Sequence, residues 1–133
     1  MKLPENSIIA SGPVIIEEGK VLLNKEQKEG YITPWMFVGG EVEEFDKSLE
    51  DACHREVKEE MGIDIEIIRP LEPIMIQNEG RVIVLIHYLA NRIGEIIPGE
   101  GIVEWGWHDI NNLPEDCTPN VYKIISKYKE REL

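Results

Sequence analysis

The sequence predicts a single α/β domain, and three observations support this prediction. Short apolar runs rich in β-branched residues are bounded by turn signals, as strands are. Two longer segments combine helical spacing of apolar residues with capping signals. The chain of 133 residues shows no repeat, low-complexity tract or linker, and a chain of this length can bury a core of its own. We therefore expect residues 1–133 to form one domain.

The first part of the chain predicts strands. Residues 8–16 are apolar and rich in β-branched side chains, residues 18–19 form a turn signal, and residues 20–23 continue as an apolar run. This order predicts a β-hairpin. Residues 31–38 predict a further short strand, and the glycine pair at residues 39–40 predicts a loop, where the backbone can turn or approach a ligand closely.

The first helix has signals at both ends. Ser48 is a good N-cap residue, with the acid Asp51 three positions later, and Gly62 is well placed to end a helix. The sequence therefore predicts a helix over residues 48–61.

The second part of the chain predicts more strands and one more helix. Apolar, strand-like segments lie at residues 63–68, 74–77, 82–90 and 102–108. Thr118 and Pro119 offer a cap and a first-turn proline for a second helix. In that helix the apolar residues Val121, Ile124, Ile125 and Tyr128 recur at helical spacing.

Composition excludes several classes of protein. A net charge of −12 should repel nucleic acid polymers, because their binding depends on Lys and Arg contacts to phosphate. No stretch approaches the ~20 apolar residues of a membrane span, so we expect no membrane partner. The N-terminal residues carry no export signal, so we expect a cytoplasmic protein.

Cysteine and histidine give no sign of a soft-metal site. Cys53 and Cys117 have no metal-ligand spacing with each other or with the histidines, and we expect them to be reduced and structural. The histidines, which show no zinc spacing and are interpreted as incidental, are His54, His87 and His108.

The first predicted helix carries a cluster of carboxylates. Glu56, Glu59 and Glu60 are spaced i, i+3 and i+4, so they lie within about 100° of arc on the helix surface. Like charges at this spacing repel. A hard divalent cation that prefers oxygen ligands, such as Mg²⁺, would relieve the repulsion.

An alternative interpretation is that these glutamates form a solvated helix face. Their position on the helix favours the metal site. With Glu56 at 0°, Leu49 lies near 20°, Glu60 near 40° and Cys53 near 60°, so the carboxylates continue an apolar stripe. Carboxylates that point toward a core or cleft are costly unless they are paired or metal-bound.

Residues 40–63 resemble the signature of the Nudix hydrolase family, Gly-x5-Glu-x7-Arg-Glu-U-x-Glu-Glu-x-Gly-U, where U is apolar. Gly40 supplies the opening glycine, and residues 55–63 match every position of the second half. Trp35, before the two glycines, resembles an aromatic residue often found there. A block with this many fixed identities is a specific signal.

The first half of the signature departs from the family pattern. Counted from Gly40, the glutamate position holds Asp46; counted back from Arg55, it holds Lys47. The loop is one residue longer, and Val38 replaces the usual proline. Either Asp46 substitutes for the glutamate from a shifted position, or that group is absent.

The resemblance implies a fold and a reaction. It implies an α/β/α sandwich around a mixed sheet, with the signature as a loop, helix and loop. Family members cleave a diphosphate linkage in a nucleoside diphosphate derivative, with Mg²⁺ or Mn²⁺ and an attacking water. Sub-signatures of the branches that act on ADP-ribose, dinucleoside polyphosphates, reduced dinucleotides or coenzyme A are not evident after Ile63. By elimination, we expect a nucleoside triphosphate or related nucleotide, with release of a nucleoside monophosphate.

The resemblance also implies roles for residues. The metal ligands would be Glu56, Glu59, Glu60 and the carbonyl of Gly40. Arg55 would orient Glu56 by a charge-assisted hydrogen bond. The general base would be Glu56 or a glutamate of a later loop. The candidates for that later group are Glu100 and Glu104; each has an alternative as an ordinary surface charge.

Substrate contacts are predicted less specifically. Asn120 lies roughly where an asparagine of the family's oxidised-guanine-nucleotide branch reads the base. Trp35 and Phe37 are candidates for substrate contact, with a core position as the alternative. Trp105 and Trp107 alternate on a predicted strand and are interpreted as core, with base stacking as the alternative. Basic residues that could meet phosphates, without a spacing that selects them, are Lys20, Arg81 and Arg92.

There are two alternatives to an enzymatic function. The first is a Nudix-fold module that binds or senses a nucleotide without catalysis, and the second is a structural or interaction domain with a solvated acidic helix. Retention of all three helix carboxylates counts against the first. The expected partner is a small nucleotide; homodimers are common in the family, but nothing in the sequence demonstrates one.

Overall fold

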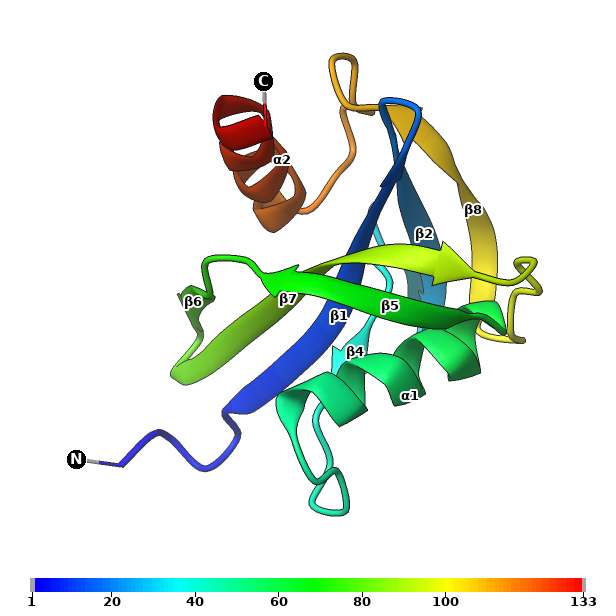
Figure 1. Ribbon diagram of the computed structural model, residues 1–133. Helices are drawn as coiled ribbons and strands as arrows, with labels where there is room; N and C mark the ends of the chain where they lie inside the picture. The colour runs from blue at the N-terminus through cyan, green and yellow to red at the C-terminus, as the bar shows by residue number, and fades with distance from the viewer. Residues whose placement is uncertain (1, 133) are drawn as a thin grey trace.

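The computed structural model describes residues 2–132 and shows a twisted mixed sheet with one helix on each side (Figure 1). The helices are α1 (Leu49–Met61) and α2 (Pro119–Glu132). The strands are β1 (Ile8–Glu17), β2 (Lys20–Lys28), β3 (Tyr31–Ile32), β4 (Gly40–Glu41), β5 (Asp64–Pro70), β6 (Ile74–Asn78), β7 (Arg81–Ile93) and β8 (Ile102–Asp109).

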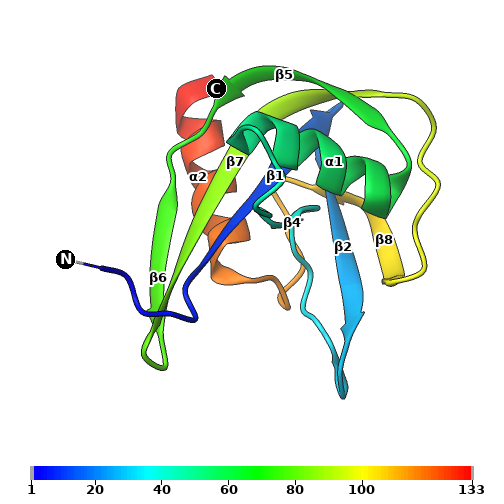
Figure 2. The ribbon, with the colours of Figure 1, turned by 90° about the horizontal axis from the view of Figure 1, so that it is seen from below.

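The sheet is mixed because its two central strands run parallel. β1 pairs with β7 in parallel, whereas the pairings of β2 with β1, β3 and β8 are antiparallel, as are those of β5 and β6 with β7 and of β4 with β1. A parallel pair needs a long crossover connection. Here the connection from β1 to β7 contains α1, which lies across the sheet in Figure 2.

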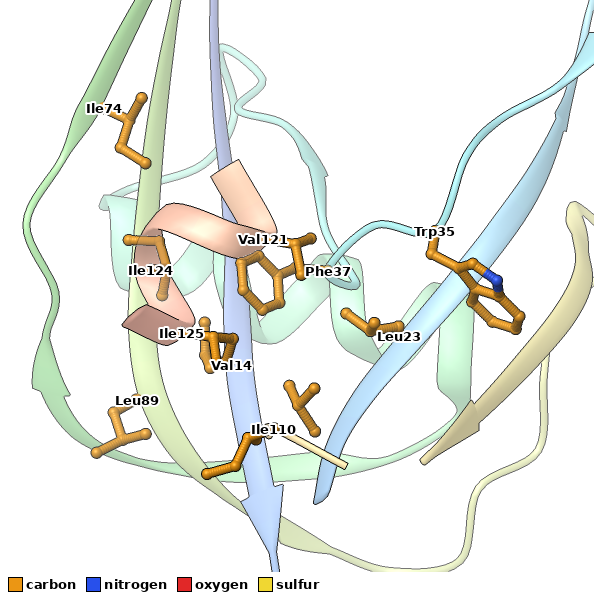
Figure 3. Packing of buried hydrophobic residues seen from close by; sticks show 11 residues of the cluster. Val14, Leu23, Trp35, Phe37, Ile74, Leu89, Ile110, Val121, Ile124 and Ile125 are labelled. Atoms are coloured by element: carbon orange, nitrogen blue, oxygen red, sulfur yellow. The ribbon is translucent and has the colours of Figure 1, made fainter. Parts of the chain in front are cut away.

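Alternation along the central strands divides the core into two layers. On β1, Val14 joins a cluster with Val121 and Ile125 of α2, whereas its neighbour Ile15 joins a cluster with Val57 of α1. Successive strand residues point to opposite faces, so a strand buried on both sides reads as a continuous apolar run. Figure 3 shows the cluster under α2. The predicted α/β/α sandwich with a mixed sheet is thus confirmed, and the strands of both predicted hairpins lie where expected.

The caps of α1 agree with the sequence. Ser48 Oγ accepts a hydrogen bond of 3.0 Å from the backbone N–H of Asp51, which satisfies a donor in the first turn. Gly62 ends the helix in the left-handed conformation, with φ of 67°, and its N–H bonds to the carbonyl of Lys58. Both ends of the acidic helix are therefore fixed by local sequence.

Three local predictions are wrong. The strand expected over residues 31–38 is only Tyr31–Ile32, because Pro34 lacks an N–H and Met36 makes only an isolated bridge to Asn24. The loop expected at residues 39–40 is instead partly a strand, since Gly40 pairs with Ser11 of β1. These differences arise from pairing with distant segments.

The third wrong prediction is the helix cap by the side chain of Thr118. Its hydroxyl makes no hydrogen bond among the described residues, and the N–H of Val121 bonds to its backbone carbonyl instead. The helix still begins at Pro119, as predicted, since proline is tolerated in the first turn. Within residues 2–132, neither helix is long and apolar enough to cross a membrane.

Candidate active site

A cavity of about 790 Å³ lies beside β1, between α1 and the start of α2. One part of its lining is acidic, a second part consists of residues without a charge at neutral pH, and Lys28 and Arg81 also line it. We call the first the acidic end, defined by Glu26, Glu41, Glu43, Glu56 and Glu60. We call the second the neutral end, defined by Phe37, His87, Thr118 and Asn120. The cavity thus joins the acidic helix to the second helix across the edge of β1.

Two carboxylates of α1 enter the acidic end over the glycine pair. The carboxylate of Glu56 lies against Gly40, where an added Cβ would be 2.4 Å from Oε2. Glu60 Oε1 accepts a 2.8 Å hydrogen bond from the N–H of Gly39. The predicted association of Gly40 with the acidic helix is therefore a direct contact in the structure.

Gly39 must be glycine at this position. Its φ is +149°, and an added Cβ would lie 2.6 Å from the carbonyl oxygen of Ser11. Both the conformation and the close approach of β1 exclude a side chain. This approach aims the N–H of Gly39 at Glu60, so backbone packing positions a carboxylate of the site.

Arg55 resolves the two alternatives for the altered loop. Its Nε and Nη2 donate to the two oxygens of Asp46, at 2.9 and 2.8 Å, and Nη2 also donates to the carbonyl of Glu41. Asp46, whose side chain is only 3% exposed, therefore supplies a carboxylate here despite the longer loop. The Arg55 contact lowers the pKa of Asp46 to about 2. Lys47 is exposed and takes no part.

The same guanidinium reaches the acidic helix. Arg55 Nη1 donates to Glu56 Oε1 at 2.9 Å and to Glu59 Oε2 at 3.3 Å. Partner carboxylates, Asp46 first, raise the pKa of Arg55, so it is charged at any working pH. Bidentate Arg–carboxylate pairs fix geometry as well as charge. Asp46 thus fixes Arg55, and Arg55 in turn contacts Glu56.

Burial and mutual repulsion act on the helix carboxylates. Burial raises the pKa of Glu60 to about 8, and the nearby carboxylates of Glu26 and Glu56 act in the same direction. Burial also raises the pKa of Glu56, partly offset by its hydrogen bond from Arg55. Glu60 therefore holds a proton at neutral pH unless a cation lies beside it.

Glu26 is a site residue that the sequence interpretation missed. It lies on β2 at an irregularity in the pairing with β8, and such bulges re-aim side chains. Its one described charged partner is Lys28, whose Nζ is 3.3 Å away. Only the strand pairing brings Glu26 toward α1, and no local pattern in residues 20–28 marks it.

The chemistry of the acidic end fits a hard divalent cation. Its donors are carboxylate oxygens with backbone groups beside them, and neither His nor Cys belongs to this end. Among the described residues, no three acidic, His or Cys side chains are already arranged to hold a metal ion. Glu56 and Glu60 are therefore the side chains placed to receive one, with the backbone of Gly40 beside them.

Three of the predicted glutamates lie outside the cavity. The carboxylate of Glu59 is 59% exposed and contacts Arg55. Glu100 is exposed and follows Gly99, whose N–H bonds to the carbonyl of Glu60 at the end of α1. Glu104 is exposed on β8, opposite Lys25. Of the candidates for the general base, the structure brings only Glu56 into the cavity.

Of the aromatic candidates, one lines the cavity and the others lie outside it. Phe37 lines the cavity at the neutral end, near Val121 of α2 in Figure 3. Trp35 does not; its ring packs in the core, edge-on to His108 with centroids 4.4 Å apart, because the chain turns it toward β8. Trp105 and Trp107 lie on β8 away from the cavity, and Trp107 packs against the α1-side core. The core interpretation therefore fits Trp107 but is wrong for Trp105, which is 36% exposed.

Asn120 and His87 meet at the neutral end. Asn120 Nδ2 and His87 Nε2 are 3.2 Å apart, and the ring of His87 lies edge-on to Phe37 at 4.9 Å between centroids. Burial lowers the pKa of His87 to about 4. The interpretation of His87 as incidental from spacing is thus incomplete, because strand β7 places it beside the cavity. A histidine within an apolar strand gave no signal of this.

The basic candidates also divide. Arg81 lines the cavity. Arg92 donates from Nε and Nη2 to the two oxygens of Glu17, at 2.9 Å each, so these two guanidinium donors are already occupied. Lys20 begins β2 opposite Asp109, outside the cavity. Cys53 and Cys117 are both free in the structure, as expected.

The NUDIX domain family model matches residues 8–128, which is nearly the whole chain. The chain belongs to the NUDIX domain family, and the enzyme class that this defines is a pyrophosphohydrolase, which hydrolyses phosphoric anhydride bonds.

Individual relatives agree with this family. An ADP-ribose pyrophosphatase of Methanocaldococcus jannaschii is 30% identical over 124 residues, which cover 90% of this chain and 72% of that protein. The crystal structure of a MutT NUDIX hydrolase from Burkholderia pseudomallei is 27% identical, with a TM-score of 0.80 over 92% of this chain and 98% of that one. The crystal structure of a MutT protein from Methanosarcina mazei Go1 is 20% identical, with a TM-score of 0.82 over 99% of this chain and 98% of that one. At this identity the likeness supports the fold alone.

Proposed function

We propose that this enzyme cleaves the diphosphate bond of a nucleoside triphosphate or a related nucleoside diphosphate derivative, with Mg²⁺ or Mn²⁺. The observation that carries the proposal is the two-ended cavity. A diphosphate needs cations at a site of oxygen ligands, whereas a nucleobase needs a flat, neutral site with few polar groups. The lining of this cavity of about 790 Å³ contains both kinds of group.

Glu56 and Glu60 would hold the metal, together with the backbone of Gly40. When bound, the metal would neutralise phosphate oxygens and make an attacking water more acidic. The protein's own contribution is to orient the carboxylates. Arg55 donates to Glu56 Oε1, and the N–H of Gly39 fixes Glu60 Oε1.

Glu56 is the best-placed general base. It lies in the cavity with its side chain only 12% exposed, and burial raises the pKa of its carboxyl. A raised pKa strengthens a carboxylate as a base toward water. Glu59 would act from outside the cavity, because Arg55 Nη1 donates a hydrogen bond to Glu59 as well as to Glu56.

The nucleotide would lie with its base at the neutral end, against Phe37 and Asn120. Lys28 and Arg81, which also line the cavity, are available to phosphate oxygens. A nucleoside diphosphate sugar is a second candidate substrate, because one relative is named as an ADP-ribose pyrophosphatase. The expected partner remains a small nucleotide.

A panel of nucleoside triphosphates and nucleoside diphosphate sugars, assayed with Mg²⁺ in ¹⁸O-labelled water, tests the proposal. We expect a nucleoside monophosphate among the products and one ¹⁸O atom on the phosphorus that water attacked. Release of inorganic phosphate alone from every triphosphate, or no turnover of any member with Mg²⁺ or Mn²⁺, would contradict it.

A further inference from the structure

The last turn of α1 is held by the loop between β7 and β8, which passes beside the end of α1 in Figure 2. We call residues 97–101 of this loop the strap. The N–H of Ile97 donates to the carbonyl of Met61, and the N–H of Gly99 donates to the carbonyl of Glu60, at 2.8 Å each. The last four carbonyls of a helix have no partners within the helix. The strap therefore supplies partners for two of these carbonyls from another segment of the chain.

The other end of the strap is anchored on β2, beside Glu26. The N–H of Gln27 donates to the carbonyl of Gly101 at 2.9 Å, and Ile102, directly after the strap, is paired with Glu26. The elements α1 and β2 bring Glu60 and Glu26 to the acidic end of the cavity. One short segment thus joins both elements by backbone hydrogen bonds.

Glu60 is fixed at two points by two different segments. Its carbonyl accepts from the N–H of Gly99, and its side-chain Oε1 accepts from the N–H of Gly39, at 2.8 Å in both cases. Glu60 is the second-last residue of α1, and the ends of helices fray. A ligand side chain in a frayed turn would have to be ordered whenever a cation binds, and this ordering costs free energy. The strap removes that cost before the cation arrives.

The strap fits closely against α1 at Gly99. An added Cβ there would lie 2.8 Å from the carbonyl oxygen of Glu59, a backbone atom that cannot rotate away. An added Cβ at Gly62 would lie 3.0 Å from the carbonyl oxygen of Ile97, on the other side of the same contact. At Gly101, an added Cβ would meet no atom of the described chain within 4 Å beyond its own neighbours. Neither Gly99 nor Gly101 has a positive φ, so the two differ in their contact with α1.

We propose that the strap is a positioning element of the metal site, in which Ile97 and Gly99 order the last turn of α1 so that the Glu60 carboxylate is in place before a cation binds. This inference rests on the proposed function, because the cation is the one that Glu56 and Glu60 would hold. Residues 97–101 are all described, and none of them lines the cavity. The strap therefore acts through α1 and does not touch the substrate.

Substitution of the two strap glycines by alanine tests the proposal. Gly99→Ala places a methyl group against the Glu59 carbonyl, which displaces the last turn of α1. Loss of a group that supports a metal ligand typically costs about tenfold or more in metal affinity. Titration calorimetry should show a Kd for Mg²⁺, and for Mn²⁺, about tenfold higher in the Gly99→Ala protein. Gly101→Ala is the matched control and should stay within about twofold of the unaltered protein. Equal affinities in the two variants would overturn the proposal.

Amide hydrogen exchange tests the strap in the unaltered protein. If opening of the strap weakens metal binding about tenfold, saturating Mg²⁺ must oppose the opening by the same factor. The N–H groups of Ile97 and Gly99 should therefore exchange about tenfold more slowly with Mg²⁺ than without it. The N–H of Asn112, which bonds to the Asp109 carbonyl in a distant turn, is the control and should not change. Unchanged exchange at Ile97 and Gly99 with bound Mg²⁺ would overturn the proposal, even if the Gly99→Ala protein fails to fold.

Hydrolysis separates positioning from a general loss of structure. The Gly99→Ala protein should need about tenfold more Mg²⁺ for half-maximal turnover, while kcat at saturating Mg²⁺ stays within about twofold. A lower kcat with an unchanged Mg²⁺ requirement would overturn the proposal. If no nucleotide is hydrolysed, the proposed function fails separately, and the calorimetry and the hydrogen exchange still decide the role of the strap. If neither Mg²⁺ nor Mn²⁺ binds the unaltered protein, the role of the strap is overturned together with the metal site.

Discussion

The acidic and neutral ends of the cavity are built from the chain in opposite ways. Most of the acidic end comes from residues 39–60, where charged side chains share one helix and the loop before it. The neutral end takes Phe37 from a loop, His87 from β7 and Asn120 from α2. Charge dominates the first, and burial with hydrogen-bond direction dominates the second.

This difference has a chemical consequence. Burial and neighbouring carboxylates raise the pKa of Glu60 at the acidic end, so a cation bound there would favour its ionised form. The neutral end has no such repulsion; among the described residues, His87 Nδ1 and Thr118 Oγ1 lack hydrogen-bond partners there. Variants at the two ends should therefore separate catalysis and metal binding from substrate selection.

The largest effect is expected at Glu56. Glu56→Gln removes the charge and the basic oxygen while keeping the size of the side chain, and it should lower kcat by about 10²- to 10⁴-fold. Nucleoside monophosphate release with Mg²⁺ measures this. Glu50→Gln, on the exposed side of the same helix, is the control and should retain activity. Equal turnover by the Glu56→Gln and unaltered proteins would remove Glu56 from the mechanism.

Burial of His87 at the neutral end should make the free energy of unfolding depend on pH. His87 has a pKa of about 4 in the fold against 6.5 as the ordinary value, so the unfolded chain binds the proton more readily. The stability contribution is complete above pH 6.5 and is lost as the pH falls toward 4. The loss should approach about 3 kcal/mol.

Urea unfolding at pH 7 and pH 4.5 measures this loss. The His87→Phe protein should lose less stability than the unaltered protein between the two pH values, and the difference isolates His87 from other groups that titrate there. An identical loss in both proteins would mean that His87 is not buried in its neutral form.

Metal binding should act on the acidic end alone. In the metal-free protein, the pKa of Glu60 is about 8, above the ordinary 4.5. The folded state then holds the proton more tightly, so this group lowers stability as the pH rises from 4.5 to 8. Glu60→Gln should therefore stabilise the metal-free protein more at pH 8 than at pH 5.

Calorimetry with Mg²⁺ completes this test. Mg²⁺ at 100 times its Kd should stabilise the unaltered protein by about 2.7 kcal/mol, and the Glu60→Gln protein should respond much less. His87→Phe should keep the full response. If neither Mg²⁺ nor Mn²⁺ changes the melting temperature, the metal site is refuted.

A smaller effect is expected in the altered loop. Asp46→Asn removes the carboxylate that binds both Nε and Nη2 of Arg55, and loss of such a supporting contact typically costs about tenfold or more in activity. Asp46→Glu should recover part of it. Glu44→Gln, an exposed neighbour, should have no effect. Full activity in the Asp46→Asn protein would show that the Arg55 geometry does not depend on Asp46.

Local sequence predicts the acidic helix well because its signals are local. Ser48 and Gly62 cap it, and helical spacing aligns Glu56 and Glu60 with Cys53 on one stripe. Prediction was poorer where long-range contacts decide the outcome. The strand expected through Trp35 is shortened by pairing with other segments, and Gly40 becomes a strand because β1 lies beside it.

The sequence alone therefore determined the acidic helix, with its two caps and with Glu56 and Glu60 on one stripe. These features depend on residues within a few turns of each other along α1. Only the tertiary structure decided that Asp46 binds Arg55, that Glu26 joins the acidic end, and that His87 meets Asn120. Those contacts join residues 9 to 34 positions apart, and only packing of the helices on a twisted mixed sheet brings them together.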